Sequence, residues 1–340
     1  MSTFFPPEWN PQSGVQLTWP HEDSDWSANL DEVNQCFAEI AREISKRQIL
    51  LIVCKKRKGI EGLLSECTMD NIRFYELKSD DTWVRDHGGI SVFNEGLPTI
   101  LDFGFNGWGG KYPATLDNQI TKRLFDHGAF RPEVNYQDHL DFILEGGSIE
   151  TDGRGTLLTT SNCLLSKERN PNFSKEEIET YLKKNLGANR ILWLNSGHLV
   201  GDDTDGHIDT LARFCNEETI AYVKCDDHSD PHFDSLQKME TVLKAFASWN
   251  GTPYRLIALP HADAVVENGQ RLPATYANFL IINGAVLLPF YGSDKDEIAR
   301  KTLQQVFSDR KVIGINCSSL IRQNGSLHCV TMQFPEGVLS

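Results

Sequence analysis

The eight cysteines of this 340-residue sequence include no C-x-x-C pair, which argues against a zinc ribbon and a thioredoxin-type dithiol. Residues 1–9 lack a basic segment followed by an apolar one, so no secretion signal is indicated. The longest apolar stretch, residues 280–290, is interrupted by Asn283, Gly284 and Pro289 and is too short to span a bilayer. We therefore expect a cytoplasmic protein in which most cysteines are buried thiols.

Positive charge is also scarce, because 33 basic residues stand against 47 acidic ones and give a formal net charge of −14. This balance disfavours nucleic acids and anionic membranes as partners and modestly favours cationic small ligands. The hydrophobic share of 40% and the charged share of 24% are typical of globular proteins. No linker rich in Pro, Gly or Ser divides the chain, so we predict a single domain over residues 1–340.

Several common catalytic and nucleotide-binding patterns are missing as well. There is no G-x-S-x-G elbow, because Gly146-Gly147-Ser148 continues into Ile149-Glu150. The sequence contains no G-x-x-x-x-G-K-[ST] and no H-E-x-x-H, and the glycines of residues 104–110 do not have G-x-G-x-x-G spacing. These absences argue against an α/β-hydrolase, a P-loop protein, a dinucleotide-binding domain and a zinc peptidase.

Negative charge is concentrated in residues 201–209, which hold four carboxylates and one imidazole. Like-charged neighbours raise one another's pKa, and a bound cation relieves their repulsion. A calcium loop is excluded because the first and twelfth EF-hand positions would be Gly201 and Ala212. A solvated acidic turn is the simpler alternative. A strand through this stretch would, however, direct His207 and Asp209 to the same face, which favours a functional site.

Secondary-structure signals repeat along the chain. Apolar residues at three-and-four spacing predict five amphipathic helices, with a shorter helical piece at 59–67. The five helices are expected at residues 29–46, 114–125, 174–187, 232–249 and 294–307. Short β-type runs are predicted at residues 49–54, 72–77, 99–103, 156–160, 191–194, 219–223, 254–259, 279–282, 286–289 and 311–315. The last four helices begin about 60 residues apart, so we predict a repeated α/β module.

One unusual polar cluster follows each predicted helix. The clusters are residues 82–89, 145–148, 207–209, 275–279 and 325–329. Modules arranged in a ring would bring all five clusters to a common axis.

Within these clusters, Cys329 is a candidate nucleophile with a base nearby, although a buried small hydrophobe is the ordinary role of a cysteine. Asp86 could pair with its neighbour Arg85, but adjacent residues of a strand face opposite sides. Glu145 could lie on the surface. The glycines that follow it suit either a turn or a closely packed centre.

Seven motifs, in order along nearly the whole chain, resemble those of the agmatine deiminase family and its bacterial peptidylarginine-deiminase-type relatives. They are Pro7-Glu8-Trp9, Trp19-Pro20, Trp83-x-Arg85-Asp86-x-Gly88, Asp102-Phe103-x-Phe105-Asn106-x-Trp108-Gly109-Gly110, Glu145-Gly146-Gly147-Ser148, Asp203-Thr204-Asp205-Gly206-His207-Ile208-Asp209 and His328-Cys329. The resemblance implies a pentein fold, an α/β propeller of five ββαβ-type modules around a pseudo-fivefold axis.

The resemblance also implies the catalytic residues. Cys329 is expected to be the nucleophile and His207 the general acid/base, while Asp86 and Asp209 hold the guanidinium group and Glu145 is a further active-site carboxylate. The reaction implied is the hydrolysis of agmatine to N-carbamoylputrescine and ammonia through a covalent thiouronium-type intermediate, a step of putrescine biosynthesis. It needs no metal and no organic cofactor.

The resemblance also implies that Asp203 binds the amine at the other end of the substrate. Trp83 and Trp108 could be core residues, but aromatic faces beside carboxylates also hold delocalised cations, so we expect both to bind substrate. Asp202 and Asp205 are expected to cap the turn.

The sequence departs from the family in the loop before His328-Cys329, where Gln323-Asn324-Gly325 replaces a Gly-Gly-Gly run. Free arginine, peptidyl arginine or another guanidine therefore stays open as substrate. A non-catalytic protein that binds polyamines or other cations is a third possibility. The role of His328 is also left open. A homodimer or higher homo-oligomer is possible, and neither nucleic acid nor membrane is expected as a partner.

Overall fold

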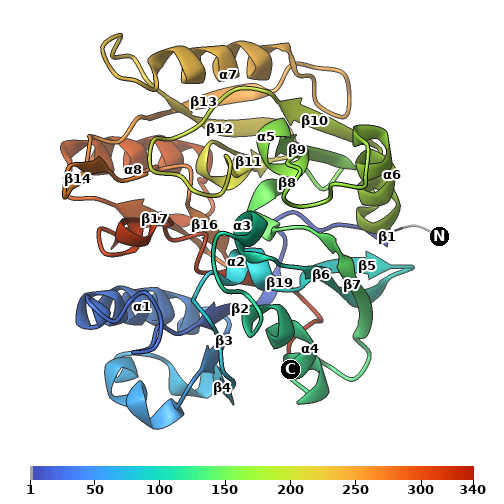
Figure 1. Ribbon diagram of the computed structural model, residues 1–340, viewed down its shortest axis with the longest axis vertical. Coiled ribbons are helices and arrows are strands. Elements are labelled where there is room, and N and C mark those ends of the chain that lie inside the picture. The colour runs from blue at the N-terminus through green and yellow to red at the C-terminus, as the bar shows by residue number, and fades with distance from the viewer. Residues whose placement is uncertain (1–2) are drawn as a thin grey trace.

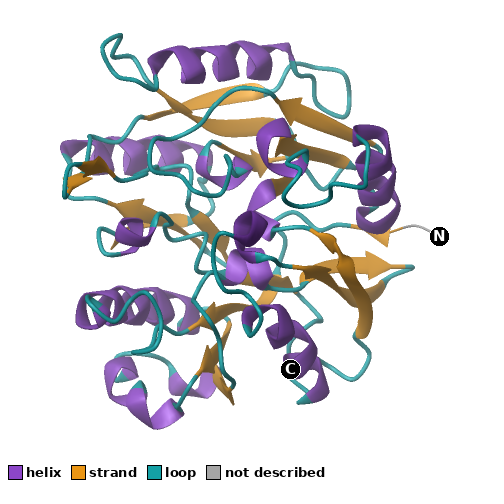
Figure 2. Ribbon diagram, in the orientation of Figure 1, coloured by secondary structure: helices purple, strands orange, loops and turns teal. Residues whose placement is uncertain are grey.

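The computed structural model describes residues 3–340. Figure 1 shows the arrangement of its elements, and Figure 2 shows the long helices at the outside of the molecule with short helical turns near its centre. The helices are α1 (Leu30–Ser45), α2 (Val84–His87), α3 (Gly107–Gly110), α4 (Ile120–Asp126), α5 (Ser161–Leu164), α6 (Lys175–Leu186), α7 (Phe233–Ala245) and α8 (Asp294–Val306). The protein is therefore built with its longest helices around the strands.

The strands of residues 3–340 form five sheets of three or four strands and one two-stranded hairpin. In chain order they are β1 (Thr3–Phe4), β2 (Gln12–Thr18), β3 (Ile49–Cys54), β4 (Ile72–Glu76), β5 (Ile90–Asn94), β6 (Leu97–Gly104), β7 (Asn135–Ile143), β8 (Ile149–Thr151), β9 (Thr156–Thr160), β10 (Arg190–Leu194), β11 (Ala212–Asn216), β12 (Thr219–Lys224), β13 (Arg255–Pro260), β14 (Val266–Glu267), β15 (Gln270–Arg271), β16 (Leu280–Ile282), β17 (Ala285–Phe290), β18 (Lys311–Asn316) and β19 (Met332–Pro335). The predicted α/β class is confirmed.

The five larger sheets share one pattern of pairing. Each contains an antiparallel pair followed by a parallel pair, namely β5-β6-β7, β8-β9-β10, β11-β12-β13, β16-β17-β18 and β19-β2-β3. In each sheet a helix connects the two parallel strands, as parallel pairing requires a crossover. The last strand, β19, pairs with β2, so both ends of the chain share one sheet.

Apolar spacing in the sequence accounts for most of these elements. All five predicted helices and all ten predicted strands are present, with ends shifted by a few residues. The helix expected from residue 114 begins later, because a 3-10 turn over Asp117–Gln119 precedes α4. Ser174 and Glu177 form a capping box at the start of α6, and Gly187 ends this helix with a φ of 66°.

Three local predictions are wrong. The segments that carry Asp86 and His207 are not strands, because the first is the single helical turn α2 and the second enters the 3-10 turn Ile208–Thr210. Turn chemistry prevails in both, since Gly88 N donates to Val84 O at 2.8 Å and Gly206 adopts a φ of 85°. The piece expected at 59–67 consists of 3-10 turns instead of one helix.

Hydrophobic side chains fill three clusters between sheets and helices. The largest includes the buried face of α1 and the strands β2 and β3, whose side chains are almost fully buried. A strand that is buried on both faces has a continuous apolar sequence, as Ile49–Cys54 has. Among residues 3–340, no helix is both long and apolar enough to cross a bilayer.

Candidate active site

The five polar clusters of the sequence meet at one buried centre. Gly147 N donates to Asp86 Oδ1 at 3.0 Å, and a Cβ atom on Gly147 would lie 2.6 Å from His207 Nδ1 and 3.2 Å from Asp209 Oδ2. Glycine is required here because side chains from two other segments occupy the space that a Cβ atom would need. Asn278 Oδ1 accepts from the backbone N of Cys329 at 3.4 Å and joins the fourth and fifth clusters.

Cys329 lies in a buried turn just before β19. Its Sγ atom is 3.9 Å from Asp209 Oδ2 and 3.4 Å from Asn278 Oδ1. Burial, with the charges of Asp209 and Asp86, raises the pKa of the Cys329 thiol well above its usual value. These surroundings therefore favour the protonated thiol.

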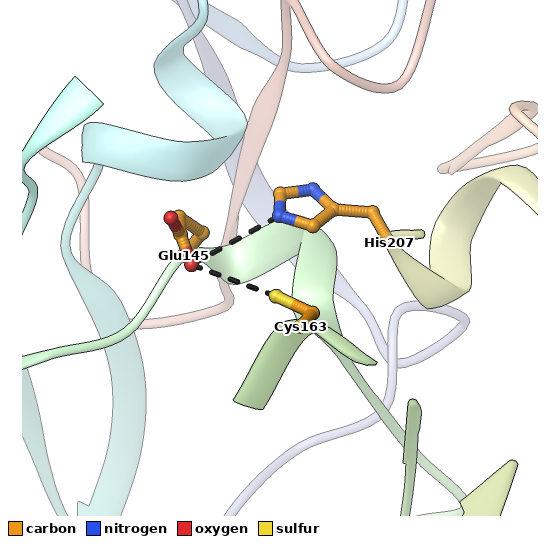
Figure 3. Close-up of side chains that lie close together, drawn as sticks. All are labelled: Glu145, Cys163 and His207. Atoms are coloured by element: carbon orange, nitrogen blue, oxygen red, sulfur yellow. Dashed lines mark hydrogen bonds and ion pairs between the residues drawn. The ribbon is translucent and has the colours of Figure 1, made fainter. Parts of the chain in front are cut away.

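His207 faces acidic groups on both sides of its ring, and Figure 3 shows the contact with Glu145. Nδ1 is 3.5 Å from Asp86 Oδ1 and Nε2 is 3.9 Å from Glu145 Oε2, and neither nitrogen has a hydrogen-bond partner within residues 3–340. Burial alone would lower the pKa of His207, but Asp86, Cys163 and Glu145 outweigh it and raise the pKa well above the usual value. The imidazolium form of His207 is therefore favoured.

Asp86 accepts from the Trp108 indole Nε1 at 2.9 Å as well as from Gly147. Burial raises the pKa of Asp86 to about 6. Arg85 turns away, since its Nε atom points to His328 O at 3.4 Å. The prediction that Arg85 and Asp86 do not pair is thus confirmed, although the backbone is a helical turn and not a strand.

Glu145 is held by Arg169, which the sequence analysis missed. Arg169 Nε lies 2.9 Å from both oxygens of Glu145, and Arg169 Nη1 donates to Asp205 at 2.7 Å. The prediction that Asp205 caps the turn is therefore wrong, whereas Asp202 does cap it by accepting from Gly206 N at 2.7 Å. Arg169 gave no sequence signal, because it lies in a charged loop of the kind that is usually solvated.

Asp209 belongs to a buried chain of charged groups that was not predicted from the sequence. His328 Nδ1 is 2.7 Å from Asp209 Oδ2, and His328 Nε2 is 2.7 Å from Glu8 Oε2. Both ring nitrogens can donate only from an imidazolium. Burial raises the pKa of Asp209, but the hydrogen bond and charge of His328 outweigh it and lower that pKa below its usual value. His328 thus contacts the carboxylate and not the sulfur.

A narrow cavity of about 20 Å³ opens onto Cys329. Four aspartates line it, and no Lys or Arg of residues 3–340 does so. The four are Asp25, Asp81, Asp86 and Asp203, and the aromatic part of the lining consists of Trp83, Trp108 and Tyr112. Uncompensated carboxylates beside aromatic faces suit a cation with more than one positive group.

Two of these lining residues are fixed by neighbours. Trp83 Nε1 donates to Asp81 at 3.1 Å, and the Trp83 ring packs so closely on Gly325 that a Cβ atom there would lie 2.1 Å away. Asp203 Oδ2 accepts from the Tyr112 hydroxyl at 2.8 Å and from Asn324 Nδ2 at 3.1 Å. Burial raises the pKa of Asp203.

Two groups of side chains have donor sets that a metal ion could use. The ligand atoms of Glu145, Cys163 and His207 lie within 4.8 Å of one another, as do those of a second group, Cys225, Asp230 and His261. A guanidinium group already occupies each, because Arg169 covers both oxygens of Glu145 and Arg271 Nη1 donates to Asp230 at 2.8 Å. An ion would have to displace these arginines, so neither group supports a metal site.

The fold and this centre define an α/β protein with a buried Cys–His–carboxylate site that faces an acidic cavity. The chain belongs to the Porphyromonas-type peptidyl-arginine deiminase family, whose model matches residues 4–335.

Relatives match over nearly the whole chain. A solved structure of a candidate arginine deiminase from Porphyromonas gingivalis is 52% identical, with a TM-score of 0.96, and the match covers 99% of this chain and 100% of that one. The C. jejuni agmatine deiminase, solved as a cysteine-to-serine variant with substrate bound, is 40% identical with a TM-score of 0.92, covering 98% and 97% of the two chains. The agmatine deiminase of Ectopseudomonas mendocina is 33% identical over 355 residues, which are 97% of this chain and 95% of the relative.

Proposed function

We propose that the protein is an agmatine deiminase, which hydrolyses agmatine to N-carbamoylputrescine and ammonia. The observation that carries the proposal is the cavity at Cys329, which is lined by four aspartates and no basic residue of 3–340. Agmatine has a guanidinium group at one end and an amine at the other, so both of its charges find carboxylates. Relatives from C. jejuni and Ectopseudomonas mendocina that carry this name support the assignment.

The proposed roles follow from the geometry around the nucleophile. Asp86 and Asp209 accept hydrogen bonds from the guanidinium nitrogens and orient its central carbon toward Cys329. The substrate's positive charge opposes the carboxylates that hold the thiol protonated, and so lowers the pKa of Cys329 on binding. The thiolate forms only when its target is in place.

The first half-reaction breaks a carbon–nitrogen bond. The Cys329 thiolate attacks the guanidinium carbon, and the tetrahedral adduct collapses as the His207 imidazolium gives its proton to the departing nitrogen. Ammonia leaves, and a cationic thiouronium group stays on sulfur. Glu145 and Asp86 favour the protonated His207 that this step requires.

The second half-reaction restores the enzyme. Neutral His207 takes a proton from water as its oxygen adds to the thiouronium carbon. The new adduct expels the Cys329 thiolate, and its hydroxyl proton passes to the sulfur, which restores the resting thiol and leaves the ureido product. The sum is one water consumed and one ammonia released for each guanidinium.

Arginine is the second candidate substrate, because the 52% identical Porphyromonas gingivalis structure was solved as a candidate arginine deiminase. The α-carboxylate of arginine would enter a cavity already lined by Asp25, Asp81 and Asp203, and this repulsion favours agmatine.

Ammonia release from agmatine, free arginine, a blocked peptidyl arginine and butylguanidine tests the proposal. We expect the highest kcat/KM for agmatine and a loss of at least about 10³-fold in kcat for Cys329→Ala, as for other nucleophile deletions. Cys67→Ser, at a half-buried thiol outside the site, is the control. Release by Cys329→Ala at the wild-type rate would exclude Cys329, and calorimetric binding without turnover would indicate a cation-binding protein.

The same proposal places the five larger sheets as five ββαβ modules around a pseudo-fivefold axis, which the shared pairing pattern and the meeting of the five polar clusters support. A cytoplasmic location, self-association and a single domain stay predictions from the sequence.

A further inference from the structure

Asn324 has a backbone conformation that few side chains adopt. Its φ of 63° and ψ of 7° lie in the left-handed region, directly after the 3-10 turn Leu320–Gln323. Glycine takes this conformation without strain, and asparagine is among the few other residues that tolerate it. A non-glycine residue at a strained position beside a reaction centre suggests that its side chain has a use.

The side chain of Asn324 has one hydrogen bond, and its acceptor is in the cavity. Asn324 Nδ2 donates to Asp203 Oδ2 at 3.1 Å, and the Tyr112 hydroxyl donates to the same oxygen at 2.8 Å. Burial, followed by the hydrogen bond to Asp203, raises the pKa of Tyr112 to about 12, so this hydroxyl remains a donor. No hydrogen bond joins the other oxygen, Oδ1, to any residue of 3–340.

We infer that Asn324 is a positioning residue that determines specificity, since with Tyr112 it occupies Oδ2 of Asp203 and leaves Oδ1 for a second positive charge on the substrate. This inference rests on the proposed function and adds to it. A guanidine with a distal ammonium group gains a fixed carboxylate oxygen, whereas a guanidine with an alkyl tail gains nothing.

Simple attachment of the loop is the competing role for Asn324, and other residues already provide it. Gln323 Nε2 donates to Asp25 O at 2.9 Å, and Arg322 pairs on the outside of the loop with Glu32 and with Glu267, the latter at 3.1 Å. None of these contacts involves Asp203. Substitution of Arg322 therefore loosens the loop without releasing Asp203, and substitution of Asn324 releases Asp203. The two effects can be tested separately.

The experiment compares Asn324→Gly with Arg322→Ala on two substrates, agmatine and butylguanidine. Glycine keeps the left-handed backbone and removes only the side chain. Loss of a hydrogen bond to a charged group predicts a KM for agmatine about tenfold higher at nearly unchanged kcat, with less than about twofold change for butylguanidine. Tyr112→Phe, which removes the second donor, should show the same selective loss, and Arg322→Ala should affect both substrates equally.

Equal effects of Asn324→Gly on both substrates, or no effect on either, would overturn the inference. Calorimetric binding of both compounds to the wild type and to Asn324→Gly gives the same comparison without turnover. If neither compound releases ammonia but Asn324→Gly weakens agmatine binding alone, the proposed reaction fails and the role of Asn324 stands. If agmatine does not bind the wild type, both fail.

Discussion

At the scale of single residues, the electrostatics of the centre hold the proposed nucleophile, Cys329, in its unreactive form and the proposed acid, His207, in its reactive form. Burial and two carboxylates keep the Cys329 thiol protonated, while the same acidic surroundings keep His207 charged. A bound guanidinium ion partly neutralises the carboxylates, which lowers the pKa of Cys329. Its departing nitrogen then needs a proton, which the charged His207 can donate. We therefore expect Cys329 to react slowly with other electrophiles.

This balance predicts opposite effects of Asp209→Asn on two reactions of Cys329. A raised pKa means less thiolate at every pH below it, so removing a carboxylate 3.9 Å from Sγ should lower the pKa and speed alkylation by iodoacetamide at pH 7.5 about tenfold. Deiminase activity should fall in the same variant, because the guanidinium loses a ligand. Peptide mass spectrometry measures alkylation of Cys329 itself.

Asn278→Ala is the control for this comparison, because Asn278 contacts the same sulfur without a charge, at 3.4 Å. It should not reproduce the acceleration. Alkylation of Asp209→Asn at or below the wild-type rate would contradict the electrostatic account of the thiol.

At the scale of elements, apolar periodicity predicts what is buried but not the turns that carry the chemistry. The strand Ile49–Cys54 could be predicted because its whole sequence is apolar. Strand β7 could not, since only one of its nine residues is buried and its sequence lacks alternation. The short turns that carry Asp86 and His207 show no hydrophobic periodicity. Hydrogen bonds donated by the backbone N–H groups of Gly147 and Gly206 fix them instead.

The candidate site was predictable for a related reason. One polar cluster after each helix is a pattern in the sequence, and the structure brings all five together. The partners that hold the catalytic groups were not predictable, because the contact of Arg169 with Glu145 and that of Glu8 with His328 join distant segments. Such contacts leave no local signal.

The turn Gly146–Ser148 provides the prediction at this scale. A Cβ atom on Gly147 would lie 2.6 Å from His207 Nδ1 and 2.8 Å from Asp86 Oδ1, so Gly147→Ala must displace one of these groups. Displacement of a catalytic group by about 1 Å predicts a loss of about 100-fold in kcat. Steady-state kinetics measure the loss, and circular dichroism shows whether the fold is kept.

Gly62→Ala is the matched control, because the Cβ atom it adds meets nothing within 4 Å. It should leave both kcat and the spectrum unchanged. Wild-type kcat in a folded Gly147→Ala would show that the turn is not tightly packed against the catalytic side chains.

At the scale of the whole molecule, the beginning and the end of the chain are joined at the site. Strand β19 pairs with β2 immediately after Cys329, and Glu336 N donates to Pro11 O at 2.8 Å. The N-terminal segment then places Glu8 against His328, against Arg213 of β11 at 3.0 Å, and against the backbone N of Ile281 in β16 at 2.6 Å. One buried carboxylate therefore connects two sheets and the turn that carries His328 and Cys329.

The prediction at this scale is that the contribution of Glu8 to the free energy of unfolding depends on pH. Burial raises the pKa of Glu8, but Arg213 and His328 outweigh it and hold the pKa far below the usual value near 4.5. A carboxyl group with a lowered folded pKa stabilises the protein at pH values above its unfolded pKa, and this contribution is lost as the pH falls through the folded pKa. Glu8→Gln removes the charge at all pH values, so it should lower the free energy of unfolding by about 3 kcal/mol at pH 7, as for one lost partner of a buried ion pair. Urea denaturation at pH 7 and at pH 3 should give a smaller difference from wild type at the lower pH.

Glu22→Gln, at an exposed glutamate that pairs with Lys55, is the control and should change little at either pH. A difference for Glu8→Gln that does not shrink on acidification would mean that the Glu8 side chain acts through its shape and hydrogen bonds, without a contribution from its charge.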